Sequence, residues 1–83
     1  MKHYIVVCDW ASDYEQGVDI VKVAHTWEEA LDAFNKRLEE ERKIVAEHED
    51  EWKIFIDEKA EFQAYEEGYY VKDHTYLYIE EVK

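Results

Sequence analysis

One segment of this chain has the apolar spacing of a long helix, and segments rich in β-branched and aromatic residues flank it on both sides. The apolar residues that share one helical face are Trp27, Ala30, Leu31, Phe34 and Leu38. Thr26 stands three residues before Glu29, as in a capping box, where each side chain accepts a hydrogen bond from the other residue's backbone N–H. These features predict a helix from Trp27 to about Glu47.

Two strands are expected before the helix. Residues 4–10 (YIVVCDW) are apolar on both faces, which is typical of an inner strand. The polar stretch 11–17 (ASDYEQG) predicts a loop. Residues 18–24 (VDIVKVA) predict a second strand, antiparallel to the first because the connection is short.

Three further segments follow the helix. Residues 52–56 predict a strand in which Trp52, Ile54 and Ile56 face inward and the alternate residues face outward. Residues 58–68 fit either a strand or a helical turn, and a strand or extended segment is favoured. Residues 75–82 predict the last strand.

The element order β-β-α-β-(β)-β predicts an α+β fold, with one long helix packed on one face of a mainly antiparallel sheet of four to five strands. The chain of 83 residues is expected to form a single compact domain, residues 1–83. Hydrophobic residues make up 47% of the chain, and thirteen residues are aromatic. This composition excludes a disordered chain. No apolar run approaches the roughly 18 residues of a membrane span, and a single cysteine excludes an internal disulfide framework.

One helix covers only part of such a sheet, so the other sheet face is expected to be amphipathic. Tyrosine suits that position, because its ring packs while its hydroxyl stays in water. The tyrosines that could supply this face are Tyr4, Tyr14, Tyr65, Tyr69, Tyr70, Tyr76 and Tyr78. They are either ordinary sheet packing or part of a binding surface. The uncovered face and an exposed last strand make a homodimer feasible.

The charge is strongly negative and unevenly placed. The chain carries 22 carboxylates against 10 Lys and Arg, a net charge of −12. Residues 39–67 hold twelve acids and four bases, a net of −8. Direct binding to nucleic acid or to an anionic membrane needs a basic surface and is therefore not expected. A basic protein surface is the expected partner, and the alternative is that the acidity only keeps the protein soluble.

No motif of a common enzyme class occurs in the chain. There is no glycine-rich phosphate loop, no HExxH and no Gly-x-Ser-x-Gly. Cys8 lies within an apolar strand, where cysteine is commonly an inert small hydrophobe. His48 lies in the acidic stretch 47–51, which is either a solvated loop or, less favoured, a divalent-metal site. We expect no enzyme activity, no cofactor and no metal.

The candidate binding surface consists of the acids of residues 39–67 and two tyrosines that follow them. These residues are Glu39, Glu40, Glu47, Glu49, Asp50, Glu51, Asp57, Glu58, Glu61, Glu66, Glu67, Tyr69 and Tyr70. Carboxylates spread over an elongated surface can imitate the regular negative charge of a nucleic-acid backbone, and a basic groove would bind them with the same Lys and Arg side chains.

In size, charge and this acid-rich stretch, the chain resembles the small acidic inhibitors that phages direct against host defence enzymes, such as anti-CRISPR and anti-restriction proteins. The resemblance rests on no diagnostic motif, so no functional residue is carried over from it. It implies a non-enzymatic, cytoplasmic inhibitor that binds a nucleic-acid-binding protein. The alternative is a small acidic cytosolic domain of phage or bacterial origin with an unspecified partner.

Overall fold

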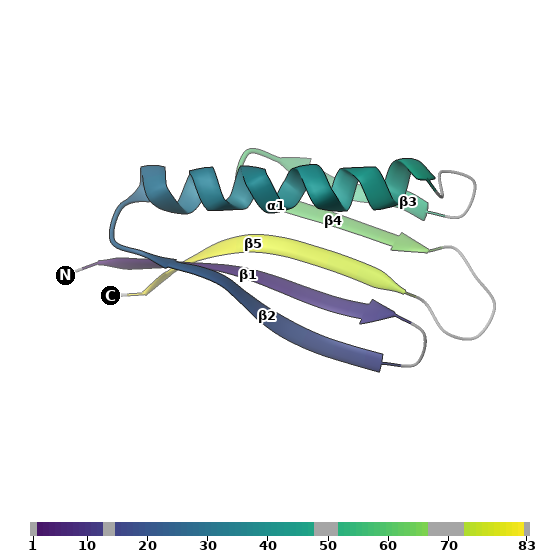
Figure 1. Ribbon diagram of the computed structural model, residues 1–83, viewed down its shortest axis with the longest axis horizontal. Coiled ribbons are helices and arrows are strands. Elements are labelled where there is room, and N and C mark those ends of the chain that lie inside the picture. The colour runs from purple at the N-terminus through teal and green to yellow at the C-terminus, as the bar shows by residue number, and fades with distance from the viewer. Residues whose placement is uncertain (1, 13–14, 48–51, 67–72, 83) are drawn as a thin grey trace.

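Five antiparallel strands form one sheet, and a long helix lies across one of its faces (Figure 1). The structure is a computed structural model that describes residues 2–12, 15–47, 52–66 and 73–82. Its elements are β1 (His3–Ser12), β2 (Glu15–Ala24), α1 (Trp27–Glu47), β3 (Trp52–Glu58), β4 (Glu61–Glu66) and β5 (His74–Val82). The α+β class and the element order predicted from the sequence are confirmed.

The helix begins and ends where the sequence predicts. The backbone N–H of Glu29 donates to Thr26 Oγ1 at 3.2 Å, so Thr26 caps the helix. The return bond of the capping box, from the Thr26 N–H to the Glu29 side chain, is not formed between these two described residues. Glu28 and Glu29 lie in the first turn, where negative charge is favourable next to the exposed N–H groups of the helix.

The hairpin between β1 and β2 is longer than predicted. The ladder continues through the pairs Trp10–Gly17, Ala11–Gln16 and Ser12–Glu15, so the prediction of a loop over 11–17 is wrong. Polar residues form the same backbone hydrogen bonds as apolar ones, so a polar stretch of sequence does not by itself end a strand. Trp10 packs so closely over Gly17 that a Cβ at Gly17 would lie 2.9 Å from Cζ2 of the indole.

The last strand is central, whereas the sequence predicts it to be exposed. The strand order is β2-β1-β5-β4-β3, and β5 pairs with β1 on one side and with β4 on the other. The prediction of an exposed last strand is therefore wrong, and the free edges of the sheet belong to β2 and β3. The chain brings its first and last strands together, as Figure 1 shows, with both termini at one end of the molecule.

The strands after the helix contain one correction and one confirmation. Residues 61–66 form β4, so the strand favoured within 58–68 is confirmed. Trp52 and Ile54 lie on the helix side as predicted, and Ile54 pairs with core residue Ala64, although it is 48% exposed there. Ile56 pairs with Gln63 on the opposite sheet face, so its predicted inward position is wrong. The register between β3 and β4 shifts between Ile54 and Ile56, and β3 is an edge strand only partly covered by α1.

The hydrophobic core lies between α1 and the sheet. Its buried residues are Val6, Cys8, Ala24, Ala30, Phe34, Val45, Phe62, Ala64 and Leu77. Tyr4 packs edge-on against Trp27, with ring centroids 5.7 Å apart, so its predicted place on the uncovered face is wrong. The opposite sheet face, which we call the far face, carries Tyr76 and Tyr78, whose rings lie 4.7 Å apart. Tyr14, Tyr69 and Tyr70 are outside the described residues.

Candidate functional site

The predicted acidic surface divides between two sides of the molecule. Glu39, Glu40 and Glu47 are exposed on α1, and Asp57 of β3 lies on the helix side, paired in register with core residue Phe62. The other predicted acids of known position are Glu58, Glu61 and Glu66, of which Glu58 and Glu61 pair with each other on the far face. Glu49, Asp50, Glu51, Glu67, Tyr69 and Tyr70 lie outside the described residues. The structure therefore brings together part of the predicted set.

The carboxylates of the helix side differ in how far nearby bases neutralise them. Asp57 accepts a hydrogen bond from Arg42 at 2.5 Å, which largely compensates its charge. Glu40 lies at the limit of ion pairing with Arg37, at 4.0 Å. Glu39 and Glu47 form no ion pair with any residue that the structure describes. They remain available to an outside cation.

Two acid–base pairs along α1 have the i,i+4 spacing that favours an ion pair, Asp32–Lys36 and Glu39–Lys43. The Asp32–Lys36 pair is formed at 3.2 Å, and the Glu39–Lys43 pair is not formed. Both members of the first pair are mostly exposed, so water screens it and its contribution to stability is small, at about 0.3–0.5 kcal/mol. Lys43 is exposed on the same part of the helix as Glu39 and reduces the local negative charge.

On the far face, Glu61 makes a different kind of contact. The Tyr76 hydroxyl donates a short hydrogen bond to Glu61 Oε2 across the strands. This bond to a carboxylate, together with partial burial and the nearby negative charge, raises the pKa of Tyr76 to about 12. Glu61 is therefore engaged within the sheet and contributes less to an outward-facing acidic surface.

A buried polar cluster beneath α1 is the main feature that the sequence prediction missed. The Glu41 side chain is only 9% exposed and accepts a hydrogen bond from Arg37 Nε at 2.9 Å. Arg37 also contacts Asp19 of β2 at 3.4 Å. The thiol of Cys8 lies 3.4 Å from the Thr75 hydroxyl and 3.9 Å from Glu41 Oε1. The cluster therefore joins the helix to three strands.

Charges in this cluster are stabilised by one another. Burial acts to lower the pKa of Arg37, but its hydrogen bond with Glu41, the nearby negative charge of Glu41 and its bond with Asp19 together raise that pKa. Burial raises the pKa of the Cys8 thiol, and the contribution of Glu41 has the same sign. The thiol therefore stays protonated at neutral pH and is a poor nucleophile.

The helical spacing contained a signal for Glu41. Phe34, Glu41 and Val45 are separated by seven and four residues, which places all three on the buried face of α1. A charged residue on that face needs a partner, and Arg37 lies one turn earlier. The helical period therefore indicates the pair, although composition alone assigns Glu41 to the solvated surface.

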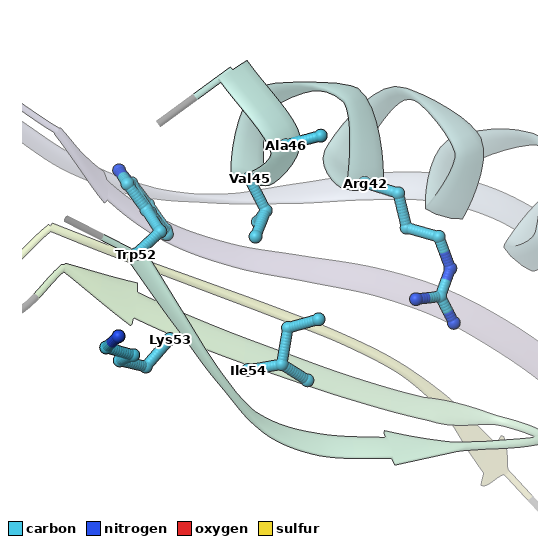
Figure 2. Close-up of a pocket in the computed structure, with 6 residues that line it drawn as sticks. All are labelled: Arg42, Val45, Ala46, Trp52, Lys53 and Ile54. Carbon is cyan, nitrogen blue, oxygen red and sulfur yellow. The ribbon is translucent and has the colours of Figure 1, made fainter. Parts of the chain in front are cut away.

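Two cavities lie beneath the second half of α1, and Trp52 lines both of them. Figure 2 shows the first, of about 420 Å³, where Trp52 and Ile54 rise from β3 toward Val45 of α1 and Arg42 reaches down beside them. It is an apolar groove with a cation at its margin. The second cavity, of about 210 Å³, is lined by Trp10, Ala11, Asp19, Arg37, Glu41, Ile44, Trp52, His74 and Thr75.

Trp10 carries a buried polar atom that lacks a partner. Its Nε1 is the one buried side-chain nitrogen or oxygen that has no hydrogen bond among the described residues. Leaving a buried donor unsatisfied costs about 1–3 kcal/mol. The indole lines the smaller cavity, so this donor marks that region as incomplete in polar contacts.

Neither a cluster of metal ligands nor a membrane-spanning helix occurs in the described part of the chain. Within residues 2–12, 15–47, 52–66 and 73–82, no three or more His, Cys, Asp and Glu side chains are arranged to hold a metal ion. The acidic stretch around His48 is outside those ranges. In the same ranges, no helix is both long and apolar enough to cross a membrane.

Comparison of the chain with protein-family models, with curated proteins and with solved structures finds no match. Function is therefore inferred from the geometry and charge of the residues themselves.

Proposed function

We propose that the protein is a non-enzymatic protein-binding module that occupies a basic, nucleic-acid-binding surface of another protein. The supporting observation is the line of exposed carboxylates Glu39, Glu40 and Glu47 on one rigid helix. They span about 12 Å of helix axis, with Glu39 and Glu40 about 1.5 Å apart along the axis and Glu47 about 10.5 Å farther on. Each strand of a DNA duplex carries one phosphate charge per about 3.4 Å of helix axis, and the Lys and Arg side chains that pair with phosphates can pair with carboxylates as well.

The proposed mode of action needs no cofactor and no reaction. Long-range attraction steers the acidic helix to a basic groove, and its carboxylates then pair with Lys and Arg side chains that otherwise contact phosphate. Bound in this way, the protein excludes DNA or RNA from the groove and inhibits its partner in the cytoplasm. This role agrees with the resemblance in size and charge to small phage inhibitors.

Partner capture from a bacterial lysate tests this function. The immobilised protein is exposed to lysate with and without nuclease treatment, and bound proteins are then challenged with duplex DNA. We expect a basic nucleic-acid-binding protein that persists after nuclease treatment and is displaced by excess DNA. A captured partner that is not basic, or that DNA does not displace, contradicts mimicry and leaves the acidity with a role in solubility.

Matched charge reversals separate a specific surface from net charge. The pair Glu39→Lys and Glu47→Lys changes the helix side, and the pair Glu58→Lys and Glu80→Lys changes exposed acids of the far face by the same total charge. We expect the helix-side pair to slow association about tenfold or more and the far-face pair to slow it much less. Equal effects indicate that net charge alone drives binding.

A further inference from the structure

The smaller cavity of about 210 Å³ lies where α1, β1, β2, β3 and β5 come together. It is smaller than the roughly 300–1,000 Å³ of pockets for drug-sized ligands, and so it suits a single side chain. Asp19, whose side chain is 50% exposed, lies where the cavity meets solvent. Glu41, whose side chain is 9% exposed, lies in its buried wall. The cavity is therefore open to solvent at one carboxylate and lined by a second one deeper in the fold.

Both carboxylates have an oxygen left for an additional donor. Glu41 makes both of its hydrogen bonds among the described residues through Oε1, to Arg37 and to Cys8. Asp19 contacts Arg37 through Oδ2 alone. Glu41 Oε2 and Asp19 Oδ1 therefore have no donor in the described structure. Arg37, the cation already present, therefore leaves one oxygen of each carboxylate without a hydrogen bond in the described part of the chain.

The walls of the cavity add a second attraction for positive charge. Two of its lining residues, Trp10 and Trp52, are indoles, whose ring faces attract cations more strongly than any other aromatic side chain does. A cationic guest therefore meets both carboxylate oxygens and indole rings in this cavity.

We propose that this cavity receives one cationic side chain, Lys or Arg, from the basic partner. The inference rests on the proposed function only for the source of the cation, because the groups that would bind the cation all line the cavity. In this arrangement the exposed carboxylates of α1 attract the partner, and the cavity holds one anchoring residue. Arg37 lines the same cavity and already sits between Asp19 and Glu41, which shows that these groups accommodate a guanidinium.

Small probes test the cavity without the partner. The probes are ethylguanidinium and n-butylammonium, which stand for the Arg and Lys side chains, and n-butanol as the uncharged control. The readout is the three indole N–H signals in NMR spectra. Trp27 is an internal reference, because it packs against Tyr4 at the opposite end of α1.

The expected result is a saturable shift of the Trp10 and Trp52 signals with at least one cationic probe, little change at Trp27 and no saturation with butanol. The stronger of the two cations identifies the anchoring residue as Arg or Lys. Equal shifts at all three indoles, or the same response to butanol, overturn the proposal.

Two variants and a matched control locate the carboxylates that bind the probe. Glu41→Gln is expected to weaken probe binding about tenfold or more, because it removes a charge-assisted hydrogen bond. Asp19→Asn, at a half-exposed position, is expected to weaken it severalfold and serves if Glu41→Gln does not fold. Glu40→Gln, next in the chain and 72% exposed, should change it less than about twofold. Unchanged binding in both cavity variants overturns the proposal.

The outcomes for the cavity and for the proposed function are distinguishable. Probe binding that depends on Glu41, with no basic partner captured, supports the cavity and contradicts nucleic-acid mimicry. A captured partner that binds Glu41→Gln as tightly as the native chain supports mimicry and overturns the anchoring role of the cavity.

Discussion

The two halves of α1 rest on the same sheet through different chemistry. The first half places Ala30 and Phe34, both fully buried, against apolar strand residues. The second half places the Arg37–Glu41 pair over the sheet, and two cavities lie beneath it. Apolar burial stabilises the fold without selecting a partner, whereas buried charges beside open space provide specific contacts. We infer that stability is concentrated in the first half and binding in the second.

The largest expected effect is at Phe34. Phe34→Ala removes a fully buried ring from the core and should lower the free energy of unfolding by about 3–5 kcal/mol. For a domain of this size that is a large part of the total stability. Ile44→Ala, in the second half and 44% exposed, is the control and should cost under about 1 kcal/mol in urea unfolding. Similar losses for the two variants contradict the division between the halves.

The second effect is at the buried ion pair. Arg37→Ala leaves Glu41 buried without its cation and should destabilise the protein by about 2 kcal/mol. This loss is smaller than the roughly 3–5 kcal/mol expected when a fully buried pair is broken, because the Arg37 side chain is 27% exposed.

Replacement of the whole pair sharpens this prediction. The double variant Arg37→Met and Glu41→Leu removes both charges and keeps comparable volume, and it should unfold near the urea midpoint of the native chain. If the double variant is as unstable as Arg37→Ala alone, the ion pair contributes net stability. That result contradicts the assignment of the second half of α1 mainly to binding.

The smallest effect concerns the helix cap. Thr26→Ala removes the acceptor of the Glu29 N–H and should cost about 1 kcal/mol in thermal or urea unfolding. Thr26→Ser keeps the hydroxyl oxygen and is the control, with a change of a few tenths of a kcal/mol expected. A loss with Thr26→Ser equal to that with Thr26→Ala means that the hydroxyl hydrogen bond is not the source of the stability.

Local signals in the sequence predict the fold well, and long-range pairing marks their limit. The cap at Thr26 and the apolar stripe place α1 at its observed bounds, because both act within a few residues. No local sequence pattern determines which strands pair with β5, so its central position in the sheet could not be predicted. The exposure of Ile54 follows from that order, since β3 becomes an edge strand.

The candidate site could be predicted only in part for the same reason. Exposed acids such as Glu39 and Glu47 follow from helical position and charge. The smaller cavity needs Trp10 and Trp52 to meet, and they come from strands on either side of α1 in the sequence. Glu41 was detectable from its spacing after Phe34, yet its contact with Cys8 and the contact of Arg37 with Asp19 depend on the tertiary fold.

The central claim is that the second half of α1 and the adjacent start of β3 form the surface that binds a basic partner. Backbone amide NMR signals recorded during titration with a short oligoarginine peptide test it most directly. We predict the largest saturable shifts within residues 37–47 and at Trp52, with little change in residues 27–34 and on β2 beyond Asp19. Largest shifts on the exposed apolar residues Val18, Ile20 and Val23 of β2, or equal shifts along the whole of α1, contradict the claim.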